Sequence, residues 1–396
     1  MNITIVGGGF GGVRAALKLA KDKTNRITLI TDKPDFQYYP ALYSAATGHS
    51  HLESWVPLTK IFAGIANIKV KIDPITAIHP DEKTVEAESG KKYHYDKCIL
   101  ALGVVTTYFG IPGLDDYAYG IKSYDEVMEL KRHLYEAIME QRQLDKHYVV
   151  IGAGATGVEL AAALGSYIKL LCRKSGMKEQ RVRVNLIEAA PRVLPKMSKQ
   201  TSERVRRRLR KLGVSIQTSK RVESATADEI MIGGKPLKSH TIIWTSGVMN
   251  HPFYKNNAAN FTFAPNGRVE VDQYMQAAED VYVIGDNAAT PYTGLAQTAL
   301  HDALFVAKNI LRENRGRERK EYKAVQPPVV VPVGDRWAVF EWHGIRLYGW
   351  MAAIIRRAAD FIGYNDILPL GQALGVWRAS RVMEDDSFLL KARQKK

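Results

Sequence analysis

The sequence predicts an α/β fold made of two Rossmann-like dinucleotide-binding domains, one interrupting the other, followed by a C-terminal helical region. Three observations lead to this prediction. Two glycine clusters each follow a short β-branched run and open a helical pattern. A later strand pattern ending in Gly-Asp, residues 280–286, returns the chain to the first block. After residue 324 the chain becomes rich in tryptophan and arginine, and an amphipathic helical pattern appears.

The bulk composition fits a globular chain of more than one domain. Its 396 residues exceed what one compact core holds, and 46% hydrophobic with 24% charged residues argue against extended disorder. The net charge of +15 predicts attraction to anions such as nucleotides, acidic lipids or nucleic acid. The two cysteines, Cys98 and Cys172, form no CxxC motif, so we expect neither a disulfide framework nor a metal site. A cytoplasmic setting fits this composition.

The first glycine cluster reads Gly7-x-Gly9-x-x-Gly12, with Gly11 in the same turn. Gly7 permits a tight strand-to-helix turn, Gly9 lets the backbone approach a pyrophosphate, and Gly12 lets the helix pack on the strand. The helix N-terminus then offers N–H groups to phosphates.

The next strand of the first block, residues 26–30, should end at an acid that binds a ribose hydroxyl. Thr31 occupies the expected position and Asp32 comes one residue later. Either side chain can make this contact, so both are candidates.

The second glycine cluster reads Gly152-x-Gly154-x-x-Gly157, and its following strand ends at Glu188 in the expected register. A carboxylate there accepts hydrogen bonds from a ribose diol and repels a 2′-phosphate, which favours NADH over NADPH. Arg192 and Lys196 lie just beyond and leave NADPH open.

The two blocks predict a discontinuous first domain, residues 1–121 and 267–323, interrupted by a second domain, residues 122–266. A helix expected over residues 297–311 follows the Gly-Asp strand in the returning part. Residues 324–396 form the predicted C-terminal region.

Five segments carry a resemblance to a known family, and they read Tyr39–Tyr43, Tyr95–Gly103, Phe109–Leu114, Ile243–Val248 and Tyr282–Asp286. With them the chain resembles the type II NADH dehydrogenases, which are single-subunit NADH:quinone oxidoreductases among the two-dinucleotide-binding flavoproteins. The resemblance implies FAD in the first domain, NADH as substrate in the second, and a homodimer.

The resemblance also implies a role for each matching residue. Near FAD it places Ile75, Ala101, Leu102, Gly103, Gly285 and Asp286. Asp286 is expected beside the ribityl chain and the flavin phosphate, whereas Ser246 and Gly247 are expected to flank NADH. Glu159 is expected where the nicotinamide stacks on the flavin, although an acid near a helix N-terminus also favours the helix dipole.

The family's quinone signature, Ala-Gln-x-Ala-x-Gln, is matched only in part. This chain has Ala296, Gln297 and Ala299 in register, but His301 replaces the second glutamine. Gln297 is expected to bind a quinone carbonyl or the flavin edge. His301 either supplies a titratable proton or is a partly solvated helix residue.

This departure leaves other functions open. One is a soluble or loosely membrane-bound NADH oxidase that uses molecular oxygen, and another is a flavoprotein that senses nucleotides without turnover. A disulfide substrate is disfavoured because the two cysteines lack redox-motif spacing. The same cysteines do not form the flavin-flanking pair of the similar sulfide:quinone reductases.

The C-terminal pattern predicts an amphipathic helix over residues 345–364 and a weaker one over residues 367–383. Arg346, Arg357 and Asp360 are expected on a polar arc, with Arg356 at its border. We expect residues 345–383 to contact an acidic membrane surface, at the inner face of the cell membrane, with self-association or packing on the chain's own domains as the alternative. The basic segment 204–211 lacks aromatic residues and a nucleic-acid motif, so no nucleic-acid partner is expected.

Overall fold

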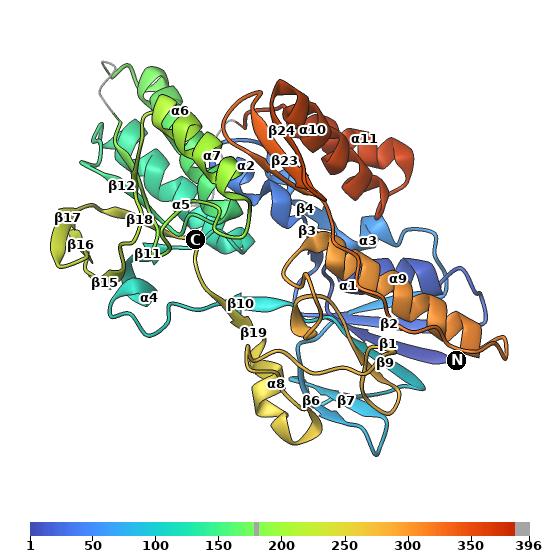
Figure 1. Cartoon of the computed structure of the whole chain (residues 1–396). Helices are drawn as coiled ribbons and strands as arrows, with labels where there is room; N and C mark the ends of the chain where they lie inside the picture. The colour runs from blue at the N-terminus through green and yellow to red at the C-terminus, as the bar shows by residue number, and fades with distance from the viewer. Residues whose placement is uncertain (178–181, 385–396) are drawn as a thin grey trace.

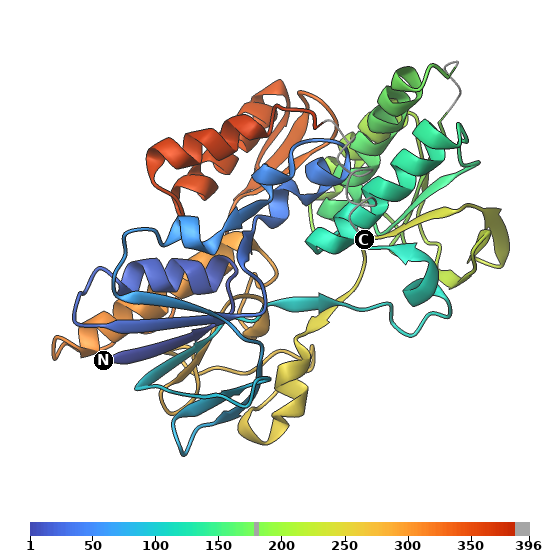
Figure 2. The ribbon, with the colours of Figure 1, turned by 180° about the vertical axis from the view of Figure 1, so that it is seen from behind.

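The computed structural model describes residues 1–177 and 182–384, which form two sheet domains and a C-terminal layer (Figures 1 and 2). The first domain has a six-stranded sheet of order β20-β21-β9-β1-β2-β5. Its strands are β1 (Asn2–Val6), β2 (Arg26–Thr31), β5 (Ile68–Ile72), β9 (Lys97–Leu100), β20 (Gln276–Ala278) and β21 (Val281–Val283). All neighbours are parallel except β20 and β21, so the carboxyl ends of the parallel strands meet at one edge.

Two helices, α1 (Phe10–Leu19) and α9 (Ala296–Glu313), lie side by side on one face of this sheet (Figures 1 and 2). The predicted helix over 297–311 is thereby confirmed. The other face carries the antiparallel meander β6 (Ile75–His79), β7 (Thr84–Ala87) and β8 (Lys92–His94). The core between the six-stranded sheet and α1 consists of buried β-branched residues of the strands and alanines of α1.

The second domain has a five-stranded, fully parallel sheet of order β11-β18-β12-β13-β14. Its strands are β11 (Ala118–Tyr119), β12 (Tyr148–Ile151), β13 (Val184–Ile187), β14 (Val214–Gln217) and β18 (Thr241–Trp244). Its helices are α4 (Leu114–Tyr117), α5 (Tyr124–Tyr135) with the π-helical turn Glu136–Glu140, α6 (Ala155–Lys174) and α7 (Lys199–Lys211). A separate antiparallel sheet contains β15 (Val222–Ala225), β16 (Glu229–Ile232) and β17 (Lys235–Lys238).

The chain crosses between the domains twice, through β10 (Val104–Thr106) and β19 (Val248–Asn250). These strands pair antiparallel and form the link seen between the domains in Figure 1. Residues 118–119 already belong to the second sheet, and α8 (Pro252–Asn256) packs on β6 of the first domain. Both crossings therefore lie before the expected boundaries at residues 121 and 266. The chain passes between the domains through these short strands, and not through the helix expected after residue 122.

The segment between β2 and β5 belongs to the first domain and packs against the second. It contains β3 (Asp35–Gln37), α2 (Leu42–Ala46), β4 (Trp55–Pro57), α3 (Leu58–Ile61) and the 3₁₀ turns Tyr39–Ala41 and His51–Glu53. Helix α2 packs against α5 and α6. Further 3₁₀ turns are Ala258–Asn260 and Gly285–Asn287.

The C-terminal region is a three-stranded antiparallel sheet covered by one helix, against which a second helix packs. It contains β22 (Val329–Pro332), β23 (Ala338–Trp342), β24 (Ile345–Gly349), α10 (Trp350–Asn365) and α11 (Leu370–Ala379). Arg14 of α1 pairs with Asp366 at 2.9 Å and ties this layer to the first domain.

The prediction of a helix from residue 345 is wrong for its first five positions, which form β24. Gly344 (φ +83°) turns the chain back, and β24 then pairs with β23. Gly349 (φ +84°) ends the strand, so the helix begins only at Trp350. The weaker segment, expected over 367–383, is helical from 370 to 379. Residues 385–396 of the predicted region lie outside the described part of the chain.

One helix in the described part of the chain, α6, is long and apolar enough to cross a membrane by length and composition. Most of it is buried in the second domain, where it carries the second glycine turn. This is the pattern of a core helix.

Candidate active site

The first glycine turn has the shape of a phosphate cradle. Gly7 has a φ of +111°, and a Cβ there would lie 2.2 Å from the carbonyl oxygen of Ala101. A Cβ on Gly12 would lie 1.9 Å from the carbonyl oxygen of Gly7, and one on Gly11 would lie 3.0 Å from Ile284. Only glycine lets strand, helix and neighbouring loop approach this closely.

Open space lies over the N-terminus of α1. A Cβ on Gly9 would meet no atom within 4 Å, and Gly9 caps α1 without a side-chain hydrogen bond. The first turn of α1 carries no acidic residue. Its free N–H groups and the positive end of its dipole therefore fit a pyrophosphate.

The two candidates for the ribose contact lie beside this turn in different settings. Thr31 is buried, and a Cβ on Gly8 would lie 2.9 Å from its hydroxyl oxygen, so Thr31 shapes the turn. The side chain of Asp32 is 60% exposed, and its nearest cation, Lys33, is 4.0 Å away. Asp32 therefore keeps free acceptor positions, but both residues stay predictions.

Ile75 begins β6 and is buried against the first core. The backbone N–H of Asp73 donates to the carbonyl oxygen of Thr31 at 2.9 Å, which brings this segment beside the end of β2. The contact of Ile75 with FAD stays a prediction.

Two buried side chains that the sequence did not point to hold the loop Gly285–Asp286. Asn287 accepts the N–H of Gly103 at 2.8 Å and donates to Asn250 Oδ1 at 2.6 Å, so it joins the loop to both crossings between domains. Asp302, fully buried, accepts the N–H of Gly285 at 3.0 Å.

Burial raises the pKa of both carboxyl groups of this loop region. For Asp286 the opposing influences are Arg268 and the N–H of Gly294, which donates at 3.1 Å. For Asp302 they are the hydroxyl of Tyr322, which donates at 2.7 Å, and the loop N–H. A charged residue on the inward side of α9 was the one sequence signal that could have identified Asp302.

Helix α9 presents its predicted residues on two different sides. Ala299 faces Gly285, since a Cβ on that glycine would lie 3.1 Å from the Ala299 side chain, and Asp302 shares that side. Gln297 and His301, four residues apart, share another side. Gln297 is exposed, and His301 Nε2 contacts the carbonyl oxygen of Lys323 at 3.0 Å.

His301 therefore lies at the wall of a separate groove of about 650 Å³, formed by the residues His301, Leu304, Phe305, Lys308, Lys320, Glu321 and Lys323. Its contact with the loop after α9 supports the structural alternative for this histidine. The structure does not bring His301 to the Gly-Asp loop.

The second glycine turn repeats the first. Gly152 has a φ of +101°, and its Cβ would lie 2.0 Å from Ser246 Oγ; a Cβ on Gly157 would lie 1.8 Å from the carbonyl oxygen of Gly152. Space over Gly154 is open to 4 Å, and α6 begins without a side-chain cap or an acid in its first turn. Gly247 (φ +72°) packs so closely on Phe109 that a Cβ would lie 2.6 Å from its ring.

Glu188 and Arg192 account for the predicted preference for NADH. Glu188 accepts the N–H groups of Ala153 at 2.6 Å and Ala190 at 2.8 Å, so its carboxylate is fixed at the turn with further lone pairs available. Arg192 donates to the carbonyl oxygens of Pro195 and Met197, both at 2.6 Å. Its guanidinium is thus occupied by its own loop, whereas Lys196 is exposed and stays open to a 2′-phosphate.

Glu159 lies beyond the first turn of α6 and is only 8% exposed, so it is not a capping acid. Burial raises its pKa to about 8, partly opposed by Arg356 and assisted by Asp360. These two partners lie 3.0 Å apart on α10, and Arg356 also donates to the carbonyl oxygen of Pro40 at 2.7 Å. Tyr38 donates to Asp360 at 3.1 Å.

Asp360, predicted on the polar arc of this helix, and Arg356, predicted at its border, share one side of α10, and that side faces the protein. Their side chains are 23% and 13% exposed and face the two domains. The arc turns inward because Glu159 of α6, Tyr43 of α2 and the Tyr38–Pro40 segment supply polar neighbours there, while apolar residues of α10 face outward. Arg346 lies on β24, where it donates to Gln200 at 3.0 Å.

Comparisons with known proteins agree with this geometry. The family model described as pyridine nucleotide-disulphide oxidoreductase matches residues 1–303. The type II NADH:quinone oxidoreductase of Staphylococcus aureus is 28% identical over 90% of this chain and 94% of its own length, and that of Staphylococcus haemolyticus is 29% identical with the same coverage. These relatives confirm the resemblance inferred from the sequence.

Solved structures share the fold. NDH2 from Plasmodium falciparum in complex with NADH superposes with a TM-score of 0.82 at 17% identity, covering 96% of this chain and 97% of that one. The sulfide:quinone oxidoreductase from Aquifex aeolicus gives 0.77 at 20% identity, covering 91% and 89%. With two matching glycine turns and a family model over most of its length, the chain belongs to the pyridine nucleotide-disulphide oxidoreductase family.

Proposed function

We propose that this chain is an FAD-dependent NADH:quinone oxidoreductase. The observation that carries the proposal is the pair of uncapped glycine turns, at Gly7–Gly12 and Gly152–Gly157, in two domains joined by paired strands. The named function of the Staphylococcus relatives supports quinone as the acceptor.

The first domain fits FAD. Gly9 leaves room for a pyrophosphate over α1, and Asp32 offers carboxylate oxygens to a ribose. Asp286, held by its loop, offers oxygens to a ribityl chain. Bound FAD supplies the redox chemistry, a hydride taken from NADH and electrons passed to a second acceptor.

The second domain fits NADH. Glu188 is positioned for the ribose diol, and the open space over Gly154 admits the pyrophosphate. Glu159, with a pKa of about 8, is mostly protonated at neutral pH and can hold or release a proton where the domains and α10 meet. The contact with the acceptor is proposed at Gln297, whose exposed amide can donate to a quinone carbonyl.

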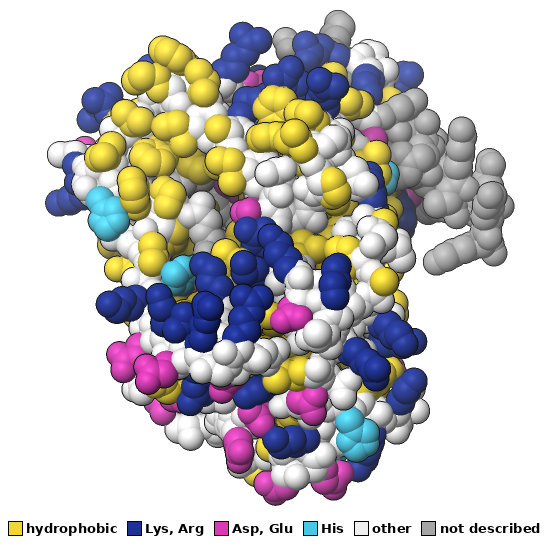
Figure 3. Space-filling model, turned by 90° about the vertical axis from the view of Figure 1, so that its right-hand side faces the viewer, with side chains coloured by type: hydrophobic (Ala, Val, Ile, Leu, Met, Phe, Trp, Pro, Cys, Tyr) yellow, Lys and Arg dark blue, Asp and Glu magenta, His cyan; other side chains and the backbone are white. Residues whose placement is uncertain are grey.

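The C-terminal layer supports contact with a membrane. Its outward side chains include Trp350, Ile354, Ile362 and Leu370, each more than half exposed (66, 57, 61 and 59%). Figure 3 shows hydrophobic side chains gathered on the upper part of the face that carries α10 and α11. An apolar surface of this kind lies naturally in the interface of a bilayer. We place the enzyme peripherally at the inner face of the cell membrane; the homodimer stays a prediction.

The test is steady-state NADH oxidation by the FAD-loaded protein with a quinone, oxygen and a water-soluble dye measured side by side. The proposal expects the quinone to give the highest kcat/KM. Equal rates with and without quinone in aerated buffer would favour an oxidase. The absence of turnover with every acceptor would favour a nucleotide sensor.

A further inference from the structure

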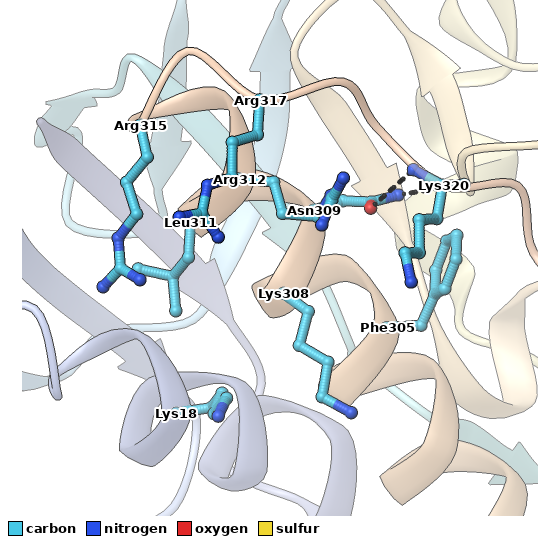
Figure 4. Close-up of a pocket in the computed structure, with 9 residues that line it drawn as sticks. All are labelled: Lys18, Phe305, Lys308, Asn309, Leu311, Arg312, Arg315, Arg317 and Lys320. Carbon is cyan, nitrogen blue, oxygen red and sulfur yellow. Dashed lines mark hydrogen bonds between the residues drawn. The ribbon is translucent and has the colours of Figure 1, made fainter.

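A groove between the C-terminal ends of α1 and α9 collects basic side chains, and its lining includes no residue of either glycine turn (Figure 4). Its volume is about 280 Å³. The residues that line it are Lys18, Phe305, Lys308, Asn309, Leu311, Arg312, Arg315, Arg317 and Lys320. Six of these nine side chains are cationic and none is acidic.

The groove has a fixed shape because the loop after α9 is bonded back to the helix. Buried Asn309 donates to the carbonyl oxygen of Lys320 at 2.8 Å and accepts its N–H at 3.0 Å, as the dashed lines of Figure 4 show. The side chain of Arg312 donates to the carbonyl oxygen of Glu318 at 2.6 Å, and its own carbonyl oxygen accepts the N–H of Arg317 at 2.9 Å. Hydrogen bonds to backbone groups of the loop, and not ion pairs, therefore fix the segments that carry these cations.

The charge of the groove is poorly compensated from within the chain. Burial and then the nearby cations Lys21, Lys308, Arg14 and Arg315 lower the pKa of Lys18. In the described part of the chain, Lys18, Lys308, Arg315 and Arg317 form no ion pair. Of the nearby acids, Glu313 contacts Lys97 at 3.1 Å. The hydrogen bonds from Thr24, and then the charge of Arg315, lower the pKa of Asp22. An external anion would relieve this crowding.

We propose that this groove binds the phosphate headgroups of acidic phospholipids and forms a second membrane contact, on the first domain. The proposal rests on the membrane contact of the C-terminal layer proposed above. Figure 3 shows a band of Lys and Arg side chains below the hydrophobic side chains on the same face of the molecule. A bilayer surface satisfies both at once, since headgroups meet the cations while the apolar side chains of α10 and α11 reach the acyl boundary.

The test is co-sedimentation of the FAD-loaded protein with phosphatidylcholine vesicles that contain or lack phosphatidylglycerol. The variant is Lys18→Gln, Arg315→Gln and Arg317→Gln together. Its control is Arg206→Gln, Arg207→Gln and Arg210→Gln, which removes equal charge from exposed positions of α7 in the second domain. Each basic side chain near an acidic surface contributes a factor of about five to partitioning, so the groove variant should bind at least about tenfold more weakly.

The α7 variant should bind acidic vesicles like the unmodified protein, and the difference between the two should shrink at high salt. Equal losses for both variants, or no loss for the groove variant, would overturn the proposal. Release from acidic vesicles by millimolar inorganic phosphate, but not by sodium chloride of the same ionic strength, would assign the groove to a soluble anion and also overturn it. Flavin content and NADH oxidation with a soluble dye report folding and the proposed activity separately, because neither requires a membrane.

Discussion

Substitution of Glu159 by glutamine tests the buried ionisable cluster where α6 meets α10. Because burial raises the pKa of Glu159 to about 8 from an ordinary value of 4.5, the folded state keeps a proton that the unfolded state releases. The free energy of unfolding therefore falls as pH rises through 4.5, by about 1.4 kcal/mol per pH unit for one group, until the folded-state pKa is passed. Below pH 4.5 this group has no effect.

Glu159→Gln removes this pH-dependent penalty while keeping the side chain's size. Relative to the unmodified protein, the variant should gain stability between about pH 5 and 8 by up to roughly 4 kcal/mol, and less if the site relaxes. The assay is the thermal unfolding midpoint, followed by circular dichroism from about pH 5 to 9. Glu203→Gln, an exposed position on α7, serves as the matched control and should leave the profile unchanged.

Parallel stability profiles for Glu159→Gln and the unmodified protein would refute the assignment of a protonated, buried Glu159. The same variant should also lose a pH-dependent limb near pH 8 in NADH oxidation with quinone, if Glu159 exchanges a proton during turnover. A rate profile identical to that of the unmodified enzyme would confine Glu159 to a structural role.

Further substitutions test the two cradles. Gly7→Ala should prevent folding of the first domain, since its Cβ would lie 2.2 Å from the carbonyl oxygen of Ala101, whereas Gly9→Ala should fold and lose FAD affinity. Circular dichroism and flavin content distinguish the two variants, and normal FAD binding by both would contradict the prediction. Glu188→Ala should lower kcat/KM for NADH by about 10- to 100-fold, because charged hydrogen bonds are lost. An unchanged kcat/KM would show that Glu188 does not bind the ribose. Asp302→Asn should weaken FAD binding by about tenfold, measured by flavin fluorescence, because the loop N–H loses a charged acceptor; an unchanged Kd would show that the loop keeps its shape without that charge.

The glycine turns were predictable from sequence because their requirement is local. Gly7 and Gly152 need positive φ angles, and Gly12 and Gly157 need the absence of a Cβ, whatever the rest of the chain does. The register of Glu188 follows in the same way from the length of one strand.

Longer-range features could not be predicted from the sequence because they depend on contacts between segments that are distant in the chain. Residues 345–349 fit an amphipathic helix as well as a strand, and only pairing with β23 decides between them. The inward direction of Arg356 depends on partners in the distant Tyr38–Pro40 segment. Asn287 and Asp302 act on backbone groups that come together only in the fold.

The most direct test of the central claim is an anaerobic titration of the FAD-loaded protein with NADH, followed at the flavin absorption band. If the two glycine turns bring a nicotinamide and a flavin together, one equivalent of NADH should bleach the band and a quinone analogue should then restore it. A protein that takes up no FAD, or whose flavin band is unaffected by NADH, would contradict the account.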